Sequence, residues 1–190
     1  MLIRPLTPGD AAAYVVIRRE MLADSPWSFI SSPEHDRGCD VAGMAASLAG
    51  PDYAVVGAFA AERYEQSSEA DARDNAPFDA RSTTHGARLV AVAGVYRERA
   101  AKRRHIAWLW GVYTTPAMRG RGLARAVLLE ILATARSWPG LAAVYLGVSE
   151  NAPAARKLYD ALGFQPWGAE PDAIRIDDRS FAETHMRLEL

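Results

Sequence analysis

The chain has 190 residues, enough for one substantial hydrophobic core but few for two full domains, so we expect residues 1–190 to form a single domain. Its 22 basic and 23 acidic side chains nearly cancel, and this balance gives no reason to expect binding to nucleic acid or to an anionic membrane. Hydrophobic residues make up 49% of the chain, which is typical of globular rather than disordered proteins.

The cysteine content and the hydropathy of the chain indicate in which cellular compartment the protein is expected. The single cysteine, Cys39, has no partner for an internal disulfide, and no Cys/His spacing indicates a zinc site, so we expect no metal and a reducing environment. The first ten residues lack the apolar run of a signal peptide, and no stretch reaches the ~18 consecutive apolar residues of a membrane span. We therefore expect a cytoplasmic protein.

The first third of the chain predicts a strand, two helices and a second strand, in that order. The first strand is expected at residues 2–6, and Asp10 can cap a helix that runs to about residue 23. A second helix is expected at 40–48. The compact, β-branched run at 53–60 then predicts a buried strand.

The segment Glu62 to Gly86 differs from its surroundings in composition. It is rich in Ser, Asp, Glu, Arg, Asn and Ala and has no sustained apolar period. A segment of this kind cannot contribute much to a hydrophobic core. We expect a long, flexible surface insertion there.

Regular structure is expected to resume with an antiparallel hairpin. Two β-branched and aromatic runs, at 88–96 and 106–114, are separated by a charged turn. The basic residues of that turn favour a solvated hairpin tip over a phosphate-binding site.

The last third of the chain predicts alternating strands and helices. Leu123, Val127 and Ile131 recur at helical spacing, so the apolar face of this helix belongs against a sheet. A strand at 142–148 and a helix from Asn151 to Gly163 are expected next. A closing hairpin at 173–177 and 184–190 completes the pattern.

The most informative segment is the Arg-Gly-Arg-Gly-Leu-Ala stretch at 119–124, between a predicted strand and a strong amphipathic helix. Glycines at such a junction allow a tight turn that points successive N–H groups outward, and the helix adds the positive end of its dipole. These features suit a pyrophosphate. A Gly-x-Gly alone also occurs at ordinary helix-opening turns, so the flanking residues must decide between the two interpretations.

Two other classes of phosphate-binding site are disfavoured. A Walker loop requires Gly-Lys-Ser/Thr, whereas Gly122 is followed here by Leu123 and Ala124. A dinucleotide fingerprint places a third glycine where this chain has Arg125, and an acidic ribose ligand on a following strand is also missing.

Two blocks resemble a known family. Residues 114–124 read Thr-x-Pro-x-x-Arg-Gly-x-Gly-x-Ala, which resembles the acyl-CoA-binding motif of the GNAT superfamily of N-acetyltransferases. One departure is Ala117, at a position where the family usually has Gln or Arg. Residues 151–164 read Asn-x-x-Ala-x-x-x-Leu-Tyr-x-x-x-Gly-Phe and look like the segment on the other wall of the family's CoA site. The resemblance covers most of the chain outside 62–86.

The resemblance implies an α/β fold with a mixed, mostly antiparallel central sheet flanked by helices. It also implies that this sheet is splayed between the strands ending near Thr114 and Val148. The expected acyl donor is acetyl-CoA, without a metal, and the expected partner is an amine acceptor. The residues that the resemblance assigns to acetyl-CoA are Val112, Thr114, Arg119, Gly120, Arg121, Gly122, Leu123, Ala124, Asn151 and Ala154.

Catalysis of acyl transfer requires a proton donor for the departing thiolate, and the resemblance places the Tyr159 hydroxyl near the CoA sulfur, as a general acid. A neutral amine also requires a proton acceptor, because alkyl ammonium groups have pKa values near ~10. His105, just before a predicted strand, is the first candidate, because histidine is the residue type whose ordinary pKa is near neutrality, and the sequence leaves three others open. These are Glu20, Glu34 and His185. Trp27 and Phe29 lie where the family commonly sets acceptor specificity and are expected to line the acceptor pocket.

These observations predict an N-acetyltransferase in which the amine attacks the thioester directly in a ternary complex, without Cys39 as a nucleophile. The alternative is a non-catalytic acyl-CoA sensor or scaffold, which would bind acetyl-CoA but lack an acceptor pocket. The sequence leaves open whether the acceptor is a small molecule or a protein lysine. It also leaves open whether two copies form a homodimer.

Overall fold

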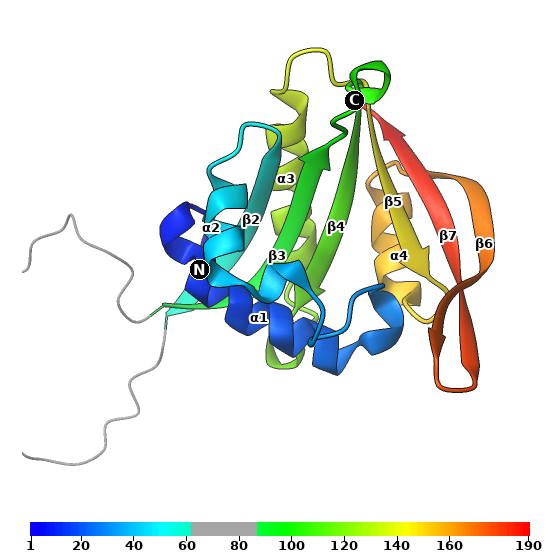
Figure 1. Cartoon of the computed structure of the whole chain (residues 1–190), viewed down its shortest axis with the longest axis horizontal. Coiled ribbons are helices and arrows are strands. Elements are labelled where there is room, and N and C mark those ends of the chain that lie inside the picture. Colours follow the sequence, from blue (N-terminus) through cyan, green and yellow to red (C-terminus); the bar gives the residue numbers. More distant parts are fainter. Residues whose placement is uncertain (62–86) are drawn as a thin grey trace, which may run out of the picture.

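A seven-stranded sheet dominates the computed structural model, which describes residues 1–61 and 87–190 (Figure 1). The strands follow the order β1-β2-β3-β4-β5-β7-β6. Neighbours pair antiparallel except β4 and β5, which are parallel. The bounds are β1 Leu2–Pro5, β2 Tyr53–Ala61, β3 Ala87–Arg97, β4 Ile106–Thr114, β5 Ala143–Ser149, β6 Gln165–Ile176 and β7 Arg179–Glu189. The long insertion expected at 62–86 lies outside the described residues.

Helices cover both faces of this sheet. Helices α1 (Ala11–Asp24) and α2 (Val41–Leu48) lie on one face, and α3 (Leu123–Arg136) and α4 (Pro153–Ala161) lie on the other (Figure 1). The hydrophobic core is divided accordingly, with one cluster under each pair of helices. The expected mixed, mostly antiparallel sheet flanked by helices is therefore confirmed. No helix in the described part of the chain is both long and apolar enough to cross a membrane.

Helix α3 has the buried apolar face that the spacing of its leucine, valine and isoleucine residues predicts. Its apolar residues recur every three or four positions, and Val127, Leu128 and Ile131 are completely buried against β2, β3 and β4. Burial of each such side chain contributes about 1.5–3 kcal/mol. The apolar face is therefore anchored against the sheet, as expected, and this fixes the position of the turn that precedes the helix.

The start of α1 differs in detail from the expectation. Asp10 occupies the capping position, but its carboxylate makes no capping hydrogen bond to the helix. It instead accepts two hydrogen bonds from Arg4 and one each from the backbone N–H and hydroxyl of Thr7, all at 2.8 Å. Asp10 therefore ties β1 to the turn before α1.

The closing hairpin and α4 correct three predicted boundaries. Strand β6 begins at Gln165 and not near residue 173, and β7 begins at Arg179 and not at residue 184. Most of β6 is exposed, so it lacks the alternation that reveals a half-buried strand. Helix α4 begins at Pro153, whose fixed φ suits the first helical position, and Asn151 lies in the preceding turn.

The feature that positions the site is a gap between β4 and β5. These strands pair only where Ile106 to Trp108 lie opposite Ala143 to Tyr145. Beyond Trp108 the two strands diverge (Figure 1). On its other side β4 has a bulge near Gly111, whose φ of +60° favours glycine. The splayed sheet that the resemblance implied is confirmed.

Candidate active site

The turn before α3 is an open cradle of backbone amides. Gly120 and Gly122 have φ values of +73° and +75°, and a Cβ on either would meet no heavy atom of residues 1–61 and 87–190 within 4 Å. Gly122 is the N-cap of α3, and no side chain of the described residues caps the N–H groups of the first helical turn. Leu123 turns its side chain into the core and leaves only its backbone at the turn, whereas Ala124 is half-buried. Unsatisfied N–H groups at the positive end of a helix dipole suit a phosphate.

The two arginines of this turn have different surroundings. The Arg119 side chain forms an ion pair with Asp24 at the end of α1 and donates from Nε to the carbonyl oxygen of Thr114, at 3.1 Å. Arg119 therefore ties the turn to α1 and β4. Arg121 is exposed and forms no ion pair with any residue in the described ranges, so its charge is available to an anion.

The free edge of β4 forms one wall of the gap. Beyond Trp108 this edge has no pairing partner in β5, so its backbone groups face the gap. Val112 and Thr114 lie on this stretch, and the buried hydroxyl oxygen of Thr114 has no hydrogen-bond partner among the described residues. An extended ligand that carries amide groups can pair with such an edge as an added strand would.

The other wall is formed by the end of β5, the turn at Asn151 and α4. Tyr159 is 6% exposed and packs edge-to-face on Phe164, with ring centroids 5.8 Å apart. Burial raises the pKa of Tyr159, so its hydroxyl stays protonated and can donate a proton. Asn151 and Ala154 are exposed at the beginning of this segment.

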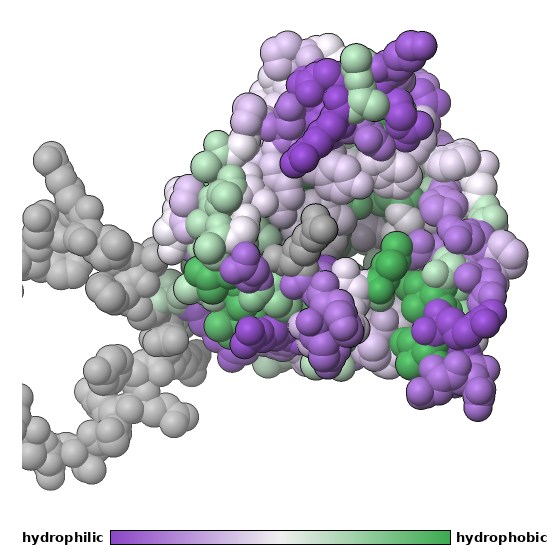
Figure 2. Space-filling model, viewed as in Figure 1, coloured by the Kyte–Doolittle hydropathy of each residue, from purple (hydrophilic) through white to green (hydrophobic). Residues whose placement is uncertain are grey.

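The loop between α1 and α2 faces the splayed half of the sheet. Its short 3₁₀ helix η2, Pro26–Ser28, lies against β5 and β6. Trp27 is 37% exposed, and Phe29 packs beside Arg18, whose guanidinium carbon lies 5.6 Å from the ring centroid. Figure 2 shows a hollow in this face of the molecule, beside β4 and β5. Trp27 and Phe29 are therefore on the same face as this hollow.

A buried ion pair anchors this loop to the bulge of β4. Arg18 and Asp36 lie 2.6 Å apart and are both buried. The Arg18 guanidinium also lies 5.6 Å from the Trp110 ring, and a Cβ on Gly111 would come within 3.5 Å of its Nη1. The ion pair thus packs directly against the part of β4 that lines the gap.

The structure does not bring His105 into this site. His105 immediately precedes β4, and its carbonyl oxygen accepts hydrogen bonds from the N–H groups of Ala142 and Ala143 at the closed end of the gap. At ~3.3 Å per strand residue, roughly 30 Å separates it from Thr114 at the open end.

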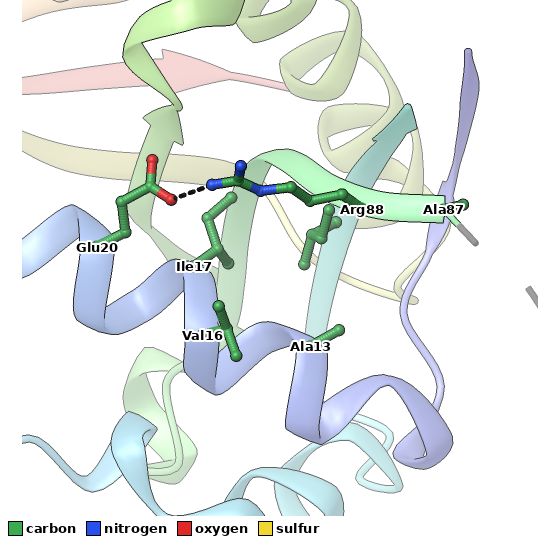
Figure 3. A pocket seen from close by; sticks show the side chains of 7 residues that line it. Ala13, Val16, Ile17, Glu20, Ala87 and Arg88 are labelled. Atoms are coloured by element: carbon green, nitrogen blue, oxygen red, sulfur yellow. Dashed lines mark hydrogen bonds and ion pairs between the residues drawn. The ribbon is translucent and has the colours of Figure 1, made fainter. Parts of the chain in front are cut away.

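Glu20 and Glu34 are also poor candidates for a base. Glu20 is bound to Arg88 at 2.8 Å and accepts a hydrogen bond from Tyr113, and Glu34 is exposed. Glu20 and Arg88 lie at a cavity of about 210 Å³ between α1 and the start of β3 (Figure 3). This cavity lies outside the gap between β4 and β5, and its one carboxylate is neutralised by an arginine.

Sequence reasoning missed Glu183 on β7. Its carboxylate lies directly over the backbone of Gly147, since a Cβ on Gly147 would come within 2.7 Å of Oε2. The sequence signal was a glycine inside an otherwise apolar strand, which often marks close approach by another group. His185, named as an alternative base, bonds to Glu170 at 3.3 Å and packs against Trp167.

Comparisons with known proteins agree with this geometry. Residues 41–164 match the Acetyltransferase (GNAT) family. The fold is similar to an acetyltransferase of the GNAT family from Streptococcus pneumoniae, with a TM-score of 0.74 and 17% identity over 100% of this chain and 99% of that chain. No curated protein matches the chain.

Two further structures are similar. One is ribosomal-protein-alanine N-acetyltransferase from Brucella melitensis, with a TM-score of 0.71 and 20% identity over 100% of both chains. The other is NAA60 from Arabidopsis thaliana in complex with acetyl-CoA, with a TM-score of 0.68 and 16% identity over 100% of this chain and 98% of that chain. Identities this low show a shared fold.

Proposed function

The chain belongs to the GNAT acetyltransferase family, and we propose that it transfers an acetyl group from acetyl-CoA to a primary amine of a small molecule or a protein. One observation supports this proposal above all: two structural features lie next to each other. The open amide cradle at Gly120 and Gly122 lies at the open end of the gap between β4 and β5. A phosphate site beside an unpaired strand edge is the combination that an acyl-CoA requires.

The described residues fit acetyl-CoA. The amides from Gly120 to Ala124 suit the pyrophosphate, and Arg121 adds charge beside them. The free edge of β4 at Val112 and Thr114 suits the amide-rich pantetheine arm. Asn151 and Ala154, on the opposite wall, are then positioned to contact the same arm.

We infer that the amine attacks the thioester carbonyl directly, in a ternary complex. The amine enters from the face that carries α1 and α2, which is also the face on which Trp27 and Phe29 lie. Attack forms the C–N bond, and collapse of the tetrahedral species breaks the C–S bond, with the electron pair leaving on sulfur. Tyr159 then donates its hydroxyl proton to that sulfur as negative charge develops.

An amine panel tests this function against the sensor alternative. The protein is mixed with acetyl-CoA and with polyamines, aminoglycosides, arylalkylamines, amino acids or lysine-bearing peptides. Free thiol and acetylated product are both measured. The proposal expects product and thiol in equal amounts with at least one class. Tight binding of acetyl-CoA with no product from any class would instead favour the sensor.

A further inference from the structure

Glu183 lies next to strand β5, on the face of the sheet that carries α1 and α2. In the antiparallel pair of β5 and β7, Glu183 is opposite Ser149, and its side chain reaches diagonally across to Gly147. A Cβ on Gly147 would lie 2.7 Å from Oε2 and 3.2 Å from Cδ of Glu183, so the carboxylate occupies the space beside Gly147 where a side chain would lie. Gly147 is two residues, or ~7 Å, beyond Tyr145, the last residue of β5 that pairs with β4. The carboxylate is therefore beside the gap.

Glu183 and Tyr159 lie on opposite sides of β5. Side chains alternate along a strand, and Leu146 and Val148 point into the core cluster that contains Tyr159. Gly147 therefore faces the other way, toward α1 and α2, and so does the carboxylate above it. An amine that approaches from that side meets Glu183 first, whereas Tyr159, the proposed proton donor for the leaving sulfur, lies on the opposite side of β5.

Among the residues that the structure describes, no cation is paired with this carboxylate. Glu183 is only 8% exposed, and it forms no ion pair or hydrogen bond with another side chain of the described residues. Burial raises its pKa above the ordinary glutamate value. This arrangement differs from that of Glu20, which is bound to an arginine and a tyrosine.

Few charged groups face this carboxylate. His185, on the same strand, lowers the pKa of Glu183, and Glu170 on β6 raises it, but both effects are smaller than that of burial. Gly147 and Ser149 of β5 do not titrate. The residues of η2, Pro26–Ser28, carry no titratable side chain.

From these positions we propose that Glu183 is the general base of the reaction and accepts a proton from the attacking ammonium group. This inference rests on the proposed acetyl transfer. The carboxylate takes one N–H proton and passes it to water, and the freed lone pair of nitrogen forms the C–N bond. The nitrogen loses a second proton as the amide forms. That second proton returns to the Tyr159 oxygen, whose own proton has gone to the thiolate. One proton is therefore released per turnover, the one that Glu183 passes to water.

The test compares Glu183→Gln with Glu183→Asp in an amine acetylation assay. The glutamine variant keeps the shape of the side chain but removes the base, so kcat should fall on the order of 100-fold near neutral pH. The aspartate variant keeps a carboxylate at shorter reach and should retain part of the rate. The matched control is Glu189→Gln, an exposed carboxylate on the same strand, which should behave as wild type. Calorimetry should show unchanged acetyl-CoA affinity in all three variants.

The pH profile distinguishes a base from a structural residue. In the wild type, kcat/KM should rise with pH as Glu183 loses its proton, and the glutamine variant should lack this limb. The difference in rate between the wild type and Glu183→Gln should also shrink toward pH ~10, because a larger fraction of the amine is then unprotonated. Equal rates for wild type and Glu183→Gln across pH would overturn the role of Glu183 and leave the proposed function intact. A wild type that binds acetyl-CoA but acetylates no amine would overturn both.

Discussion

The carboxylate of Glu183 occupies the space that a side chain at position 147 would need, so Gly147 and Glu183 are sterically linked across β5 and β7. A Cβ at 2.7 Å from a carboxylate oxygen is too close to be tolerated, so one of the two groups must move. The carboxylate is at the end of a flexible side chain, and it is the group that would move.

Gly147→Ala should therefore lower activity without unfolding the protein. The added methyl group displaces the Glu183 carboxylate from the gap, and kcat should fall roughly ten-fold or more if Glu183 is the base. Steady-state kinetics and a thermal melt measure the two effects. Gly168→Ala on β6 is the matched control, because a Cβ there meets no heavy atom of the described chain within 4 Å and φ is ordinary. Wild-type kcat in Gly147→Ala would show that the position of this carboxylate does not matter.

Gly122→Val should weaken acetyl-CoA binding while the chain stays folded. The left-handed φ of +75° costs a residue with a Cβ about 1–2 kcal/mol, and a β-branched side chain adds to this strain. The turn should relax to a conformation in which its amides no longer converge. Calorimetry should show a loss of affinity of at least ten-fold, with Gly168→Ala again unchanged. An unaltered dissociation constant in a folded Gly122→Val protein would place the pyrophosphate elsewhere.

Tyr159→Phe should retain fold and acetyl-CoA affinity but lower the maximal rate. The substitution removes the hydroxyl and leaves the ring to pack on Phe164. Loss of a general acid typically costs on the order of 100-fold in rate, or ~3 kcal/mol of barrier. Rates at saturating acetyl-CoA measure the effect, and Tyr96→Phe, an exposed tyrosine on β3, serves as control. If thioester cleavage limits both enzymes and their maximal rates agree, Tyr159 is a packing residue.

The sequence was most informative where the pattern is local. The hairpin of β3 and β4 and the amphipathic helix α3 were predicted because each depends on neighbours in the chain. The glycine turn could also be found, because Gly120 and Gly122 directly precede the first apolar residue of that helix and so mark where the chain must turn.

What the sequence did not reveal depends on contacts between distant segments. Glu183 meets Gly147 only because β7 inserts between β5 and β6, and nothing local indicates that order. The extension of β6 to Gln165 was missed because an exposed edge strand carries no alternation. His105 was chosen because it directly precedes a strand, but proximity to a strand in sequence does not show which end of that strand lies at the site.

Asp10 should contribute stability that disappears in acid. Hydrogen bonds from Arg4, reinforced by Thr7, lower the pKa of Asp10 to about 2, whereas an unfolded aspartate has a pKa near ~3.9. A group with a lowered pKa in the folded state stabilises it above the unfolded value and loses this contribution as pH falls. The free-energy difference between wild type and Asp10→Asn should therefore be constant above pH ~5 and shrink as pH falls toward ~2. Denaturant titrations across this range measure it, and a difference that does not change with pH would contradict the assignment.

The most direct test of acetyl transfer follows a labelled acetyl group through a single turnover. Protein in excess over acetyl-CoA labelled in its acetyl group is mixed with an accepted amine, quenched at short times and analysed by intact-protein and product mass spectrometry. We predict that the label moves to the amine with release of one equivalent of free thiol, and that the protein itself never carries it. Label that appears on the protein before the product would contradict direct attack, and label that never leaves CoA with any amine would contradict the enzymatic function itself.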